Sequence, residues 1–206
     1  MDLSVSDQPM KESLHLSFIR FCMEIMKVKD MATFLHTLNV YHLAQNVLSV
    51  MDQGKIFKAA VEIGSALHDF GKIALPKALL MKNGLLDNDE MGKVRTHPVV
   101  GYEIVKQFEK HLPTEVLEIV LCHHERNGGI GYPNRIQNLP LHVEAVAVCD
   151  IAAAMQEHRP HRNGYTLDVC INELHQYVWS PQITQIIRRH EDAFLLQEYE
   201  REILKV

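Results

Sequence analysis

The chain has 206 residues, of which 47% are hydrophobic and 23% charged, and its formal net charge at pH 7 is -5. This length and composition predict one folded domain with a single buried core, and they exclude a disordered chain. The negative charge argues against a protein that binds duplex nucleic acid, because phosphate contacts along a duplex need a basic face.

The N-terminal part of the chain is predicted to form a packed helix over residues 14–28. This stretch is apolar, but Arg20, Glu24 and Lys27 interrupt it, and it is too short to cross a bilayer. The start of the chain lacks a signal peptide, and the cysteines form no Cys-x-x-Cys pair, so we expect reduced thiols and a cytoplasmic protein. The four cysteines are Cys22, Cys122, Cys149 and Cys170.

Apolar residues recur at helical spacing along nearly the whole chain, and the alternating runs typical of strands are absent. The sequence therefore predicts an all-α fold. Asp30 is expected to cap a second helix that runs to about Met51. A third helix is expected from about Lys55 to Gly71.

The middle of the chain carries further helix-start signals. Residues 87–90 have the arrangement of a capping box, and Pro98 is expected to open a helix that continues through Phe108. Pro113 and Thr114 are expected to start the next helix, which ends at residues 123–124.

Three glycines, Gly128, Gly129 and Gly131, then predict a loop. The following helix, about Leu141 to Glu157, is almost entirely apolar around a single carboxylate, Asp150. A lone charge in such surroundings requires a partner of opposite charge. Residues 180–181, Ser-Pro, are expected to start a terminal helix that reaches about Leu204.

Histidine and aspartate residues of the type that bind metals are spread along these helices. Imidazole and carboxylate are ligands that iron, manganese and zinc accept, and four imidazoles with two carboxylates exceed what one ion needs. Two ions that share a bridging carboxylate would use all six side chains, which makes a metallohydrolase the leading hypothesis. The six residues are His68, Asp69, His97, His123, His124 and Asp150.

Several motifs occur together and in order. They are His68-Asp69-Phe70-Gly71-Lys72, Met91 to Gly101 with His97-Pro98, His123-His124-Glu125-Arg126 and Gly131-Tyr132-Pro133. Together they resemble the HD-GYP family, a branch of the HD-domain phosphohydrolases, over roughly residues 32–164.

The resemblance implies one helical bundle of about seven to nine helices with a two-metal or three-metal centre, and hydrolysis of the bacterial second messenger cyclic di-GMP. The expected organisation is an N-terminal helical segment over residues 1–30, a metal-binding core over 31–165, and C-terminal helices over 166–206 that pack on it.

The resemblance also implies which residues hold each ion, with Asp69 as the bridge between them. His36 completes the set, although its segment reads His-x-x-Asn39-Val where the family usually has His-x-x-Arg-Val, and His42 is a rival for this ligand. One ion would be held by His36, His68, Asp69 and Asp150, and the other by Asp69, His97, His123 and His124.

The resemblance also bears on the number and kind of metal ions. Family members with a third metal have a glutamate one helical turn before the first histidine, and this chain has Ala32 there. Two divalent ions are therefore expected, with iron or manganese favoured by the resemblance and zinc, nickel or magnesium as alternatives. A binuclear centre is expected to open the cyclic dinucleotide and to stop at the linear product.

The expected chemistry is attack on phosphate by a hydroxide activated between two cations. Asp69 and Lys72 are the predicted catalytic residues, and Lys72 would also meet a phosphate oxygen. Tyr132, Arg159 and Arg162 are the other predicted substrate contacts. Two departures from the family pattern lie near them: Arg159-Pro160-His161 replaces Arg-Pro-Tyr, and Gly128-Gly129 replaces Asp-Gly.

Other readings of these residues and of the whole chain remain open. Lys72 and the two arginines could cap or solvate helix ends, and Cys122 and Cys149 could be small core residues. The chain could be a catalytically weak nucleotide-binding or protein-binding module that docks a partner through residues 131–133, or a homodimer formed through its tail. It could also be another nucleotide phosphohydrolase or a di-iron oxygenase of the wider superfamily. The remaining histidines, among them His111, His142, His158, His161, His175 and His190, are interpreted as core or surface residues.

Overall fold

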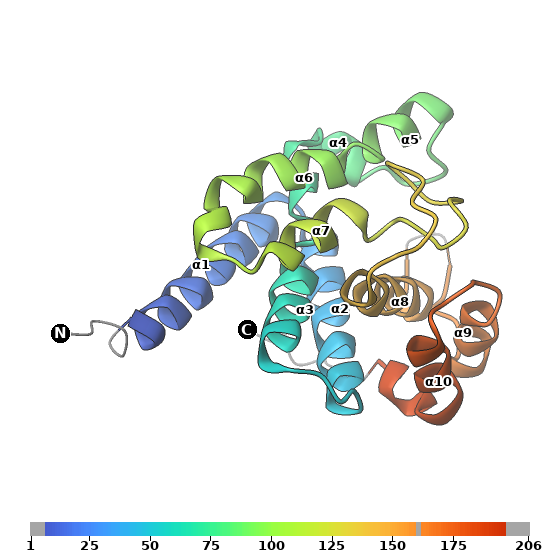
Figure 1. Ribbon diagram of the computed structural model, residues 1–206. Helices are drawn as coiled ribbons and strands as arrows, with labels where there is room; N and C mark the ends of the chain where they lie inside the picture. Colours follow the sequence, from blue (N-terminus) through green and yellow to red (C-terminus); the bar gives the residue numbers. More distant parts are fainter. Residues whose placement is uncertain (1–6, 160–161, 197–206) are drawn as a thin grey trace.

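The computed structural model describes residues 7–159 and 162–196, and within these ranges the named elements are all helices, as predicted. Figure 1 shows their arrangement. In chain order they are α1 (Asp7–Lys29), α2 (Met31–Ser49), α3 (Lys55–Leu67), the 3-10 helix η1 (Phe70–Ala74), α4 (Lys77–Leu80), α5 (Asn88–Val94), α6 (His97–Val105), η2 (Lys106–His111), α7 (Thr114–Cys122), α8 (Leu141–Gln156), α9 (Leu167–Leu174), α10 (Pro181–Arg189) and η3 (Glu191–Phe194).

The predicted caps start three of these helices. The side chain of Asp30 accepts a hydrogen bond from Thr33 N at 2.9 Å at the start of α2. Asp87 and Glu90 form the expected capping box of α5, and the Ser180 hydroxyl accepts from the main chain in the first turn of α10. These caps satisfy main-chain N–H groups that have no partner inside the helix.

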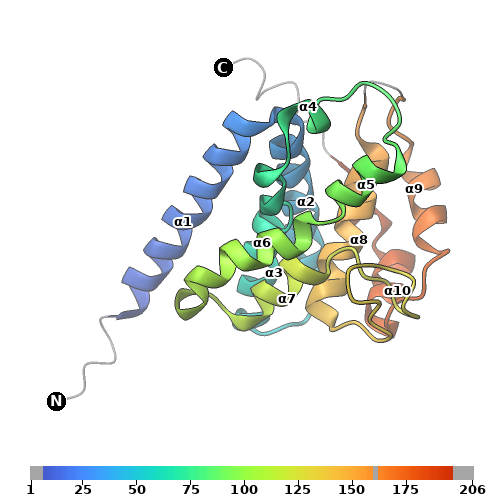
Figure 2. The ribbon, with the colours of Figure 1, turned by 90° about the horizontal axis from the view of Figure 1, so that it is seen from above.

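Helices α2, α3, α7 and α8 form the centre of the molecule, with α1 on one side and α9 and α10 on the other (Figures 1 and 2). The core has two apolar parts. One gathers around α2, α8 and α10 and includes Val40, Val146 and Phe194, and the other joins α1, α3 and α7 through Met26, Leu67 and other residues. Burial of these faces is the main favourable contribution to folding.

Two predicted helices end earlier than expected. The helix expected to reach Gly71 stops at Leu67, and a separate 3-10 turn begins at Phe70. This break lets η1 lie against α6, where a Cβ atom on Gly71 would overlap the His97 carbonyl group. Likewise α6 ends at Val105 and continues as 3-10 helix η2, rather than remaining α-helical through Phe108.

The prediction of one terminal helix to Leu204 is wrong for the part that can be tested. Helix α10 ends at Arg189, and His190 has a non-helical backbone with φ of -137°. The chain turns there because Phe194 in η3 is fully buried in the core. The remainder of that prediction, residues 197–206, lies outside the described residues.

Among the described helices, none combines the length and the apolar character needed to cross a membrane.

Candidate metal centre

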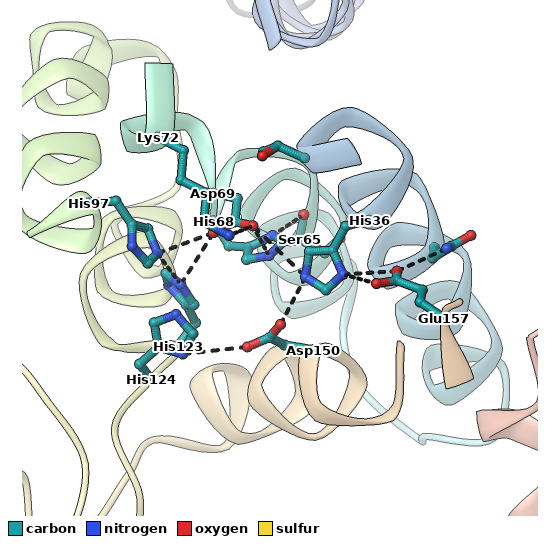
Figure 3. Close-up of polar contacts among 12 residues, drawn as sticks. His36, Ser65, His68, Asp69, Lys72, His97, His123, His124, Asp150 and Glu157 are labelled. Atoms are coloured by element: carbon teal, nitrogen blue, oxygen red, sulfur yellow. Dashed lines mark hydrogen bonds and ion pairs between the residues drawn. The ribbon is translucent and has the colours of Figure 1, made fainter. Parts of the chain in front are cut away.

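All seven predicted ligands converge at the place where α2, α3, α6, α7 and α8 meet (Figure 3). Most of them stand at helix ends: two follow α3, one opens α6 and two follow α7. Six are buried, and His124 is partly exposed. The seven residues are His36, His68, Asp69, His97, His123, His124 and Asp150.

Asp69 lies between two groups of histidines and points one carboxylate oxygen at each. Its Oδ1 is 3.1 Å from His97 Nε2 and 4.0 Å from His123 Nε2. Its Oδ2 is 3.5 Å from His68 Nε2 and 3.8 Å from His36 Nε2. Candidate ligand atoms of Asp69, His97, His123 and His124 all lie within 4.8 Å of one another, as do those of His36, His68 and Asp69. This is the geometry expected of a bridging carboxylate.

Asp150 faces both groups as well. Its Oδ1 is 3.0 Å from His36 Nε2, and its Oδ2 is 3.5 Å from His124 Nδ1. The resemblance assigned Asp150 to the ion of His36 and His68, and the contact with His36 agrees with that assignment. The second oxygen places it beside the other group too, so the two groups share both of their carboxylates.

The hydrogen bonds of three histidines leave lone pairs directed into the centre. Nδ1 of His68, His97 and His123 lies 2.8, 2.7 and 3.0 Å from the main-chain oxygens of Ser65, Val94 and Val120. A carbonyl oxygen only accepts, so each Nδ1 carries the proton and each neutral ring presents an Nε2 lone pair.

These lone pairs lack donors. His68 Nε2 is buried and has no hydrogen-bond partner, and the Nε2 atoms of His97 and His123 face each other at 3.1 Å. Two acceptors at that distance repel unless positive charge lies between or beside them. The residues present therefore fit divalent cations, which imidazole nitrogens and carboxylate oxygens bind readily.

The pKa values of the centre point in the same direction. Burial lowers the pKa of His68, lowers that of His123 well below its usual range, and lowers that of His124 to about 3, so all three rings are neutral. Burial alone would raise the pKa values of Asp69 and Asp150, but neighbouring groups, including Lys72 and His36, hold both well below the ordinary range. Neutral imidazoles and ionised carboxylates are the protonation states that bind metal.

His36 differs from the other rings. Burial acts to lower its pKa, but Glu157 and Asp150 outweigh this effect and raise the pKa to about 10. Glu157 is buried, and its carboxylate oxygens lie 2.9 and 3.0 Å from His36 Nδ1. Glu157 was not among the predicted site residues, because a glutamate at a helix end is usually solvated. Its position seven residues, or about two helical turns, after Asp150 is compatible with the same face of α8 but does not mark it as buried.

Lys72 and Tyr132, both predicted to contact substrate, border the centre. Lys72 Nζ lies 2.6 Å from Asp69 Oδ2 and is 21% exposed, so it is both paired and accessible. The Tyr132 ring stacks on His124 at 4.7 Å between centroids, with an interplanar angle of 27°. Arg95, which was not among the predicted site residues, lies over the Tyr132 ring, with its guanidinium carbon 5.4 Å from the ring centroid.

The two predicted phosphate-binding arginines occupy different environments. Arg159 is 41% exposed at its side chain, and its Nη2 lies 3.6 Å from Glu157 Oε2. Arg162 instead donates hydrogen bonds from its guanidinium to the main-chain oxygens of Ala154 and Met155, at the end of α8. These bonds cap helix carbonyls at the end of α8, and the phosphate contact predicted for Arg162 stays a prediction.

The glycine-containing loop after α7 is held by a buried carboxylate. Glu125 accepts hydrogen bonds from the main-chain N–H groups of Asn134, Arg135 and Ile136. Arg126 donates to the main-chain oxygens of His123 and Glu125 rather than pairing with the Glu125 carboxylate. The loop that carries Tyr132 is therefore tied to the same segment as the ligands His123 and His124.

The remaining candidates lie outside the centre. His42, the rival of His36, lines a separate hollow with Asn46 and Leu196. Cys122 and Cys149 are buried free thiols whose pKa values are raised by burial, in keeping with a core role.

Two aspartates shared between two groups of histidines at the meeting point of five helices define the class of this protein: an all-α domain with a candidate metal centre. The sequence model of the HD domain family matches residues 20–183, and the chain belongs to that family. Its resemblance to the HD-GYP branch is confirmed by relatives named as cyclic dinucleotide phosphodiesterases.

Two such relatives are bacterial. The chain is 28% identical over 203 residues to "Cyclic di-GMP phosphodiesterase" of Thermotoga maritima, covering 93% of this chain and 55% of the relative. It is 31% identical over 140 residues to "3'3'-cGAMP-specific phosphodiesterase 2" of Vibrio cholerae, covering 66% of this chain and 27% of the relative. The chain thus spans about half or less of the length of these relatives.

A solved structure supports the fold. The L. monocytogenes phosphodiesterase PgpH HD domain aligns with a TM-score of 0.62 at 16% identity, covering 84% of this chain and 94% of that one. At this identity the likeness establishes the shared helical fold alone.

Proposed function

We propose that this chain is a metal-dependent phosphodiesterase that hydrolyses a cyclic dinucleotide, with cyclic di-GMP as the first candidate. The observation that carries the proposal is the pair of Nε2 atoms of His97 and His123, which face each other at 3.1 Å beside ionised Asp69. Relatives named for cyclic di-GMP and for 3'3'-cGAMP support the substrate class.

Two divalent cations would be held by the seven side chains of the centre, with Asp69 between them. So bound, they supply Lewis-acid stabilisation of a phosphoryl group and lower the pKa of water. Iron or manganese is the proposed metal, and zinc, nickel or magnesium is the alternative.

The remaining residues act on the substrate itself. Lys72 would donate to a phosphate oxygen beside Asp69, and the partial exposure of its side chain supports this role. Tyr132 offers a ring and Arg95 a guanidinium at the rim of the centre. Arg159 offers a second guanidinium, which lies beside Glu157, the carboxylate that contacts His36. Ala32, at the position where three-metal relatives carry a glutamate, supports two ions and a linear dinucleotide as the product.

The proposal includes a cytoplasmic location in bacteria, where cyclic dinucleotides act, and it is consistent with four free cysteines. Two further predictions remain: a protein partner that docks on the loop of residues 131–133, and formation of a homodimer. Ile130, next to this loop, is 76% exposed and offers an apolar contact for such a partner.

The test is metal analysis of anaerobically purified protein coupled to a turnover assay with cyclic di-GMP, 3'3'-cGAMP and cyclic di-AMP. We expect two ions per chain and metal-dependent formation of a linear dinucleotide, which Asp69→Asn abolishes. Asp52→Asn, at an exposed loop position, is the matched control. Binding of the dinucleotides without turnover in iron, manganese or zinc would support the binding-module alternative, and free GMP as the main product would contradict the predicted end point.

A further inference from the structure

The end of α8 carries a buried carboxylate that faces a candidate metal ligand. Glu157 follows the last residue of α8 and is 9% exposed. Both of its oxygens lie within 3.0 Å of His36 Nδ1. On its other side, Asn39 Nδ2 donates to Glu157 Oε1 at 3.0 Å, and Arg159 Nη2 lies 3.6 Å from Oε2.

This arrangement differs from that of the neighbouring ligands. His68, His97 and His123 each direct Nδ1 at a main-chain carbonyl oxygen three residues earlier in the chain. His36 directs Nδ1 at a carboxylate that is 121 positions away in sequence. The group that accepts the His36 Nδ1 hydrogen bond is therefore negatively charged, and it comes from the end of α8, whereas His36 lies on α2.

Two carboxylates, one within α8 and one directly after it, hold the His36 ring, one at each nitrogen. Asp150 Oδ1 lies 3.0 Å from Nε2, and Glu157 lies against Nδ1 (Figure 3). An ionised carboxylate accepts a hydrogen bond and does not donate one, so Nδ1 keeps its proton when a cation occupies the Nε2 side. The Nε2 lone pair then faces Asp69 and Asp150, where the proposed ion lies.

We propose that Glu157 is a positioning residue for the metal ion at His36: it selects the ring tautomer, sets the ring angle and makes the imidazole a stronger ligand. Asn39 and Arg159 hold Glu157 in place for this role. The inference rests on the proposed metal centre and assigns a function to Asn39, where the family usually has arginine. A hydrogen-bonded carboxylate behind a metal-binding histidine typically changes metal affinity by about 10- to 100-fold.

The test uses Glu157→Ala and Glu157→Gln in the metal-free 206-residue chain. Manganese is titrated into each protein, bound ions are counted by elemental analysis, and electron paramagnetic resonance reports whether the ions lie side by side. We expect the wild type to bind two ions with a spin-coupled spectrum. In Glu157→Ala one ion should bind about 10- to 100-fold more weakly, with an uncoupled signal at intermediate manganese concentration. Glu157→Gln should lie in between, because its amide oxygen still accepts from Nδ1 but carries no charge.

The matched control is Glu144→Ala on the same helix. Glu144 is fully buried and accepts hydrogen bonds from Asn127 and Ser180, away from the centre. We expect this variant to lower the free energy of unfolding without changing manganese affinity. Wild-type affinity for both ions in Glu157→Gln and Glu157→Ala would overturn the inference, as would equal weakening by Glu144→Ala. If Glu157→Ala does not fold, Glu157→Gln carries the comparison.

The titration separates this inference from the proposed function. Two ions bound tightly by the wild type without turnover of any cyclic dinucleotide would contradict the function and leave the comparison of Glu157 variants intact. A wild type that binds fewer than two ions would overturn both.

Discussion

His97 and His123 face each other through their Nε2 atoms at 3.1 Å while both Nδ1 atoms are held by carbonyl oxygens three residues earlier in the chain. As neutral rings, neither can donate to the other without breaking one of those bonds. The neutral pair is therefore stable only beside positive charge, so the two facing acceptors should lower the stability of the metal-free protein.

The first prediction concerns stability against pH in the metal-free protein. The pKa of folded His124 is about 3, below its unfolded value of about 6.5, and the pKa values of His68 and His123 are shifted in the same direction. The unfolded chain therefore binds more protons below about pH 6.5, and stability should fall as the pH drops through that range. His36, with a folded pKa of about 10, contributes stability below pH 6.5 that is lost as the pH rises towards 10.

Together these shifts predict a maximum in the urea midpoint of metal-free protein near pH 6.5 to 7. Bound metal should flatten the curve between about pH 7 and 8, because His36 then binds the cation instead of a proton. The fall above about pH 8.5 should remain, because cysteines ionise there in the unfolded chain while burial raises the pKa values of Cys122 and Cys149 in the folded one. Urea unfolding at intervals between pH 5 and 9, with and without manganese, measures both effects. A midpoint of the metal-free protein that rises steadily to pH 9 would contradict the assignment of His36.

The second prediction concerns the stack of Arg95, Tyr132 and His124. If Arg95 and Tyr132 contact substrate, Arg95→Ala should raise KM roughly 10-fold, about the loss of one charge-assisted contact, with kcat and metal content little changed. Tyr132→Phe should retain the ring stack and most of the affinity. Lys93→Ala, an exposed cation on the same helix α5, is the control for general charge effects. If KM is unchanged in Arg95→Ala, Arg95 does not contact the substrate and only packs on Tyr132.

The third prediction concerns the approach of η1 to α6. Gly71→Ala should destabilise the protein by about 1–3 kcal/mol or more, since its Cβ would overlap the His97 carbonyl group. It should also weaken metal binding, because it separates Asp69 from His97. Gly92→Ala is the matched control: the site is open and helical, and the change should stabilise by about 0.4–1 kcal/mol. Thermal unfolding of both variants gives the comparison, and equal midpoints would refute the close contact.

The fourth prediction concerns the loop anchor Glu125. Glu125→Ala leaves three main-chain N–H groups without their acceptor, which should cost about 3 kcal/mol or more of stability. Hydrogen exchange of Asn134, Arg135 and Ile136 should accelerate more than that of α2. Exchange that stays slow at these three amides would show that the loop is held by other contacts.

Much of the centre could be predicted because several of its ligands come directly after apolar helical segments in the sequence. His68, His123 and His124 come directly after buried helical runs, and Asp150 stands alone among apolar residues, so each position is readable from the local pattern. The local pattern does not separate His36 from His42, since both lie on α2. The resemblance assigned His36, and the structure shows that the two side chains meet different neighbours.

Two roles were not readable in this way. A glutamate at a helix end is usually solvated, so nothing local marked Glu157 as buried against His36. The run around Arg159 and Arg162 suits phosphate binding and helix capping equally well. Which one applies depends on the chain reversal that pairs these two residues and turns Arg162 back towards α8.

The wide spacing of the ligands has a further consequence for how the protein resists unfolding. His36 and Asp150 lie 114 positions apart, yet a single ion would join them, together with His68 and Asp69 at the end of α3. Such a cross-link exists only in the native state, so α2 and α8 could not separate without releasing the ion. Protease digestion should therefore report metal occupancy directly: loaded chains should resist cleavage between α2 and α8, and chelated chains should be cut there.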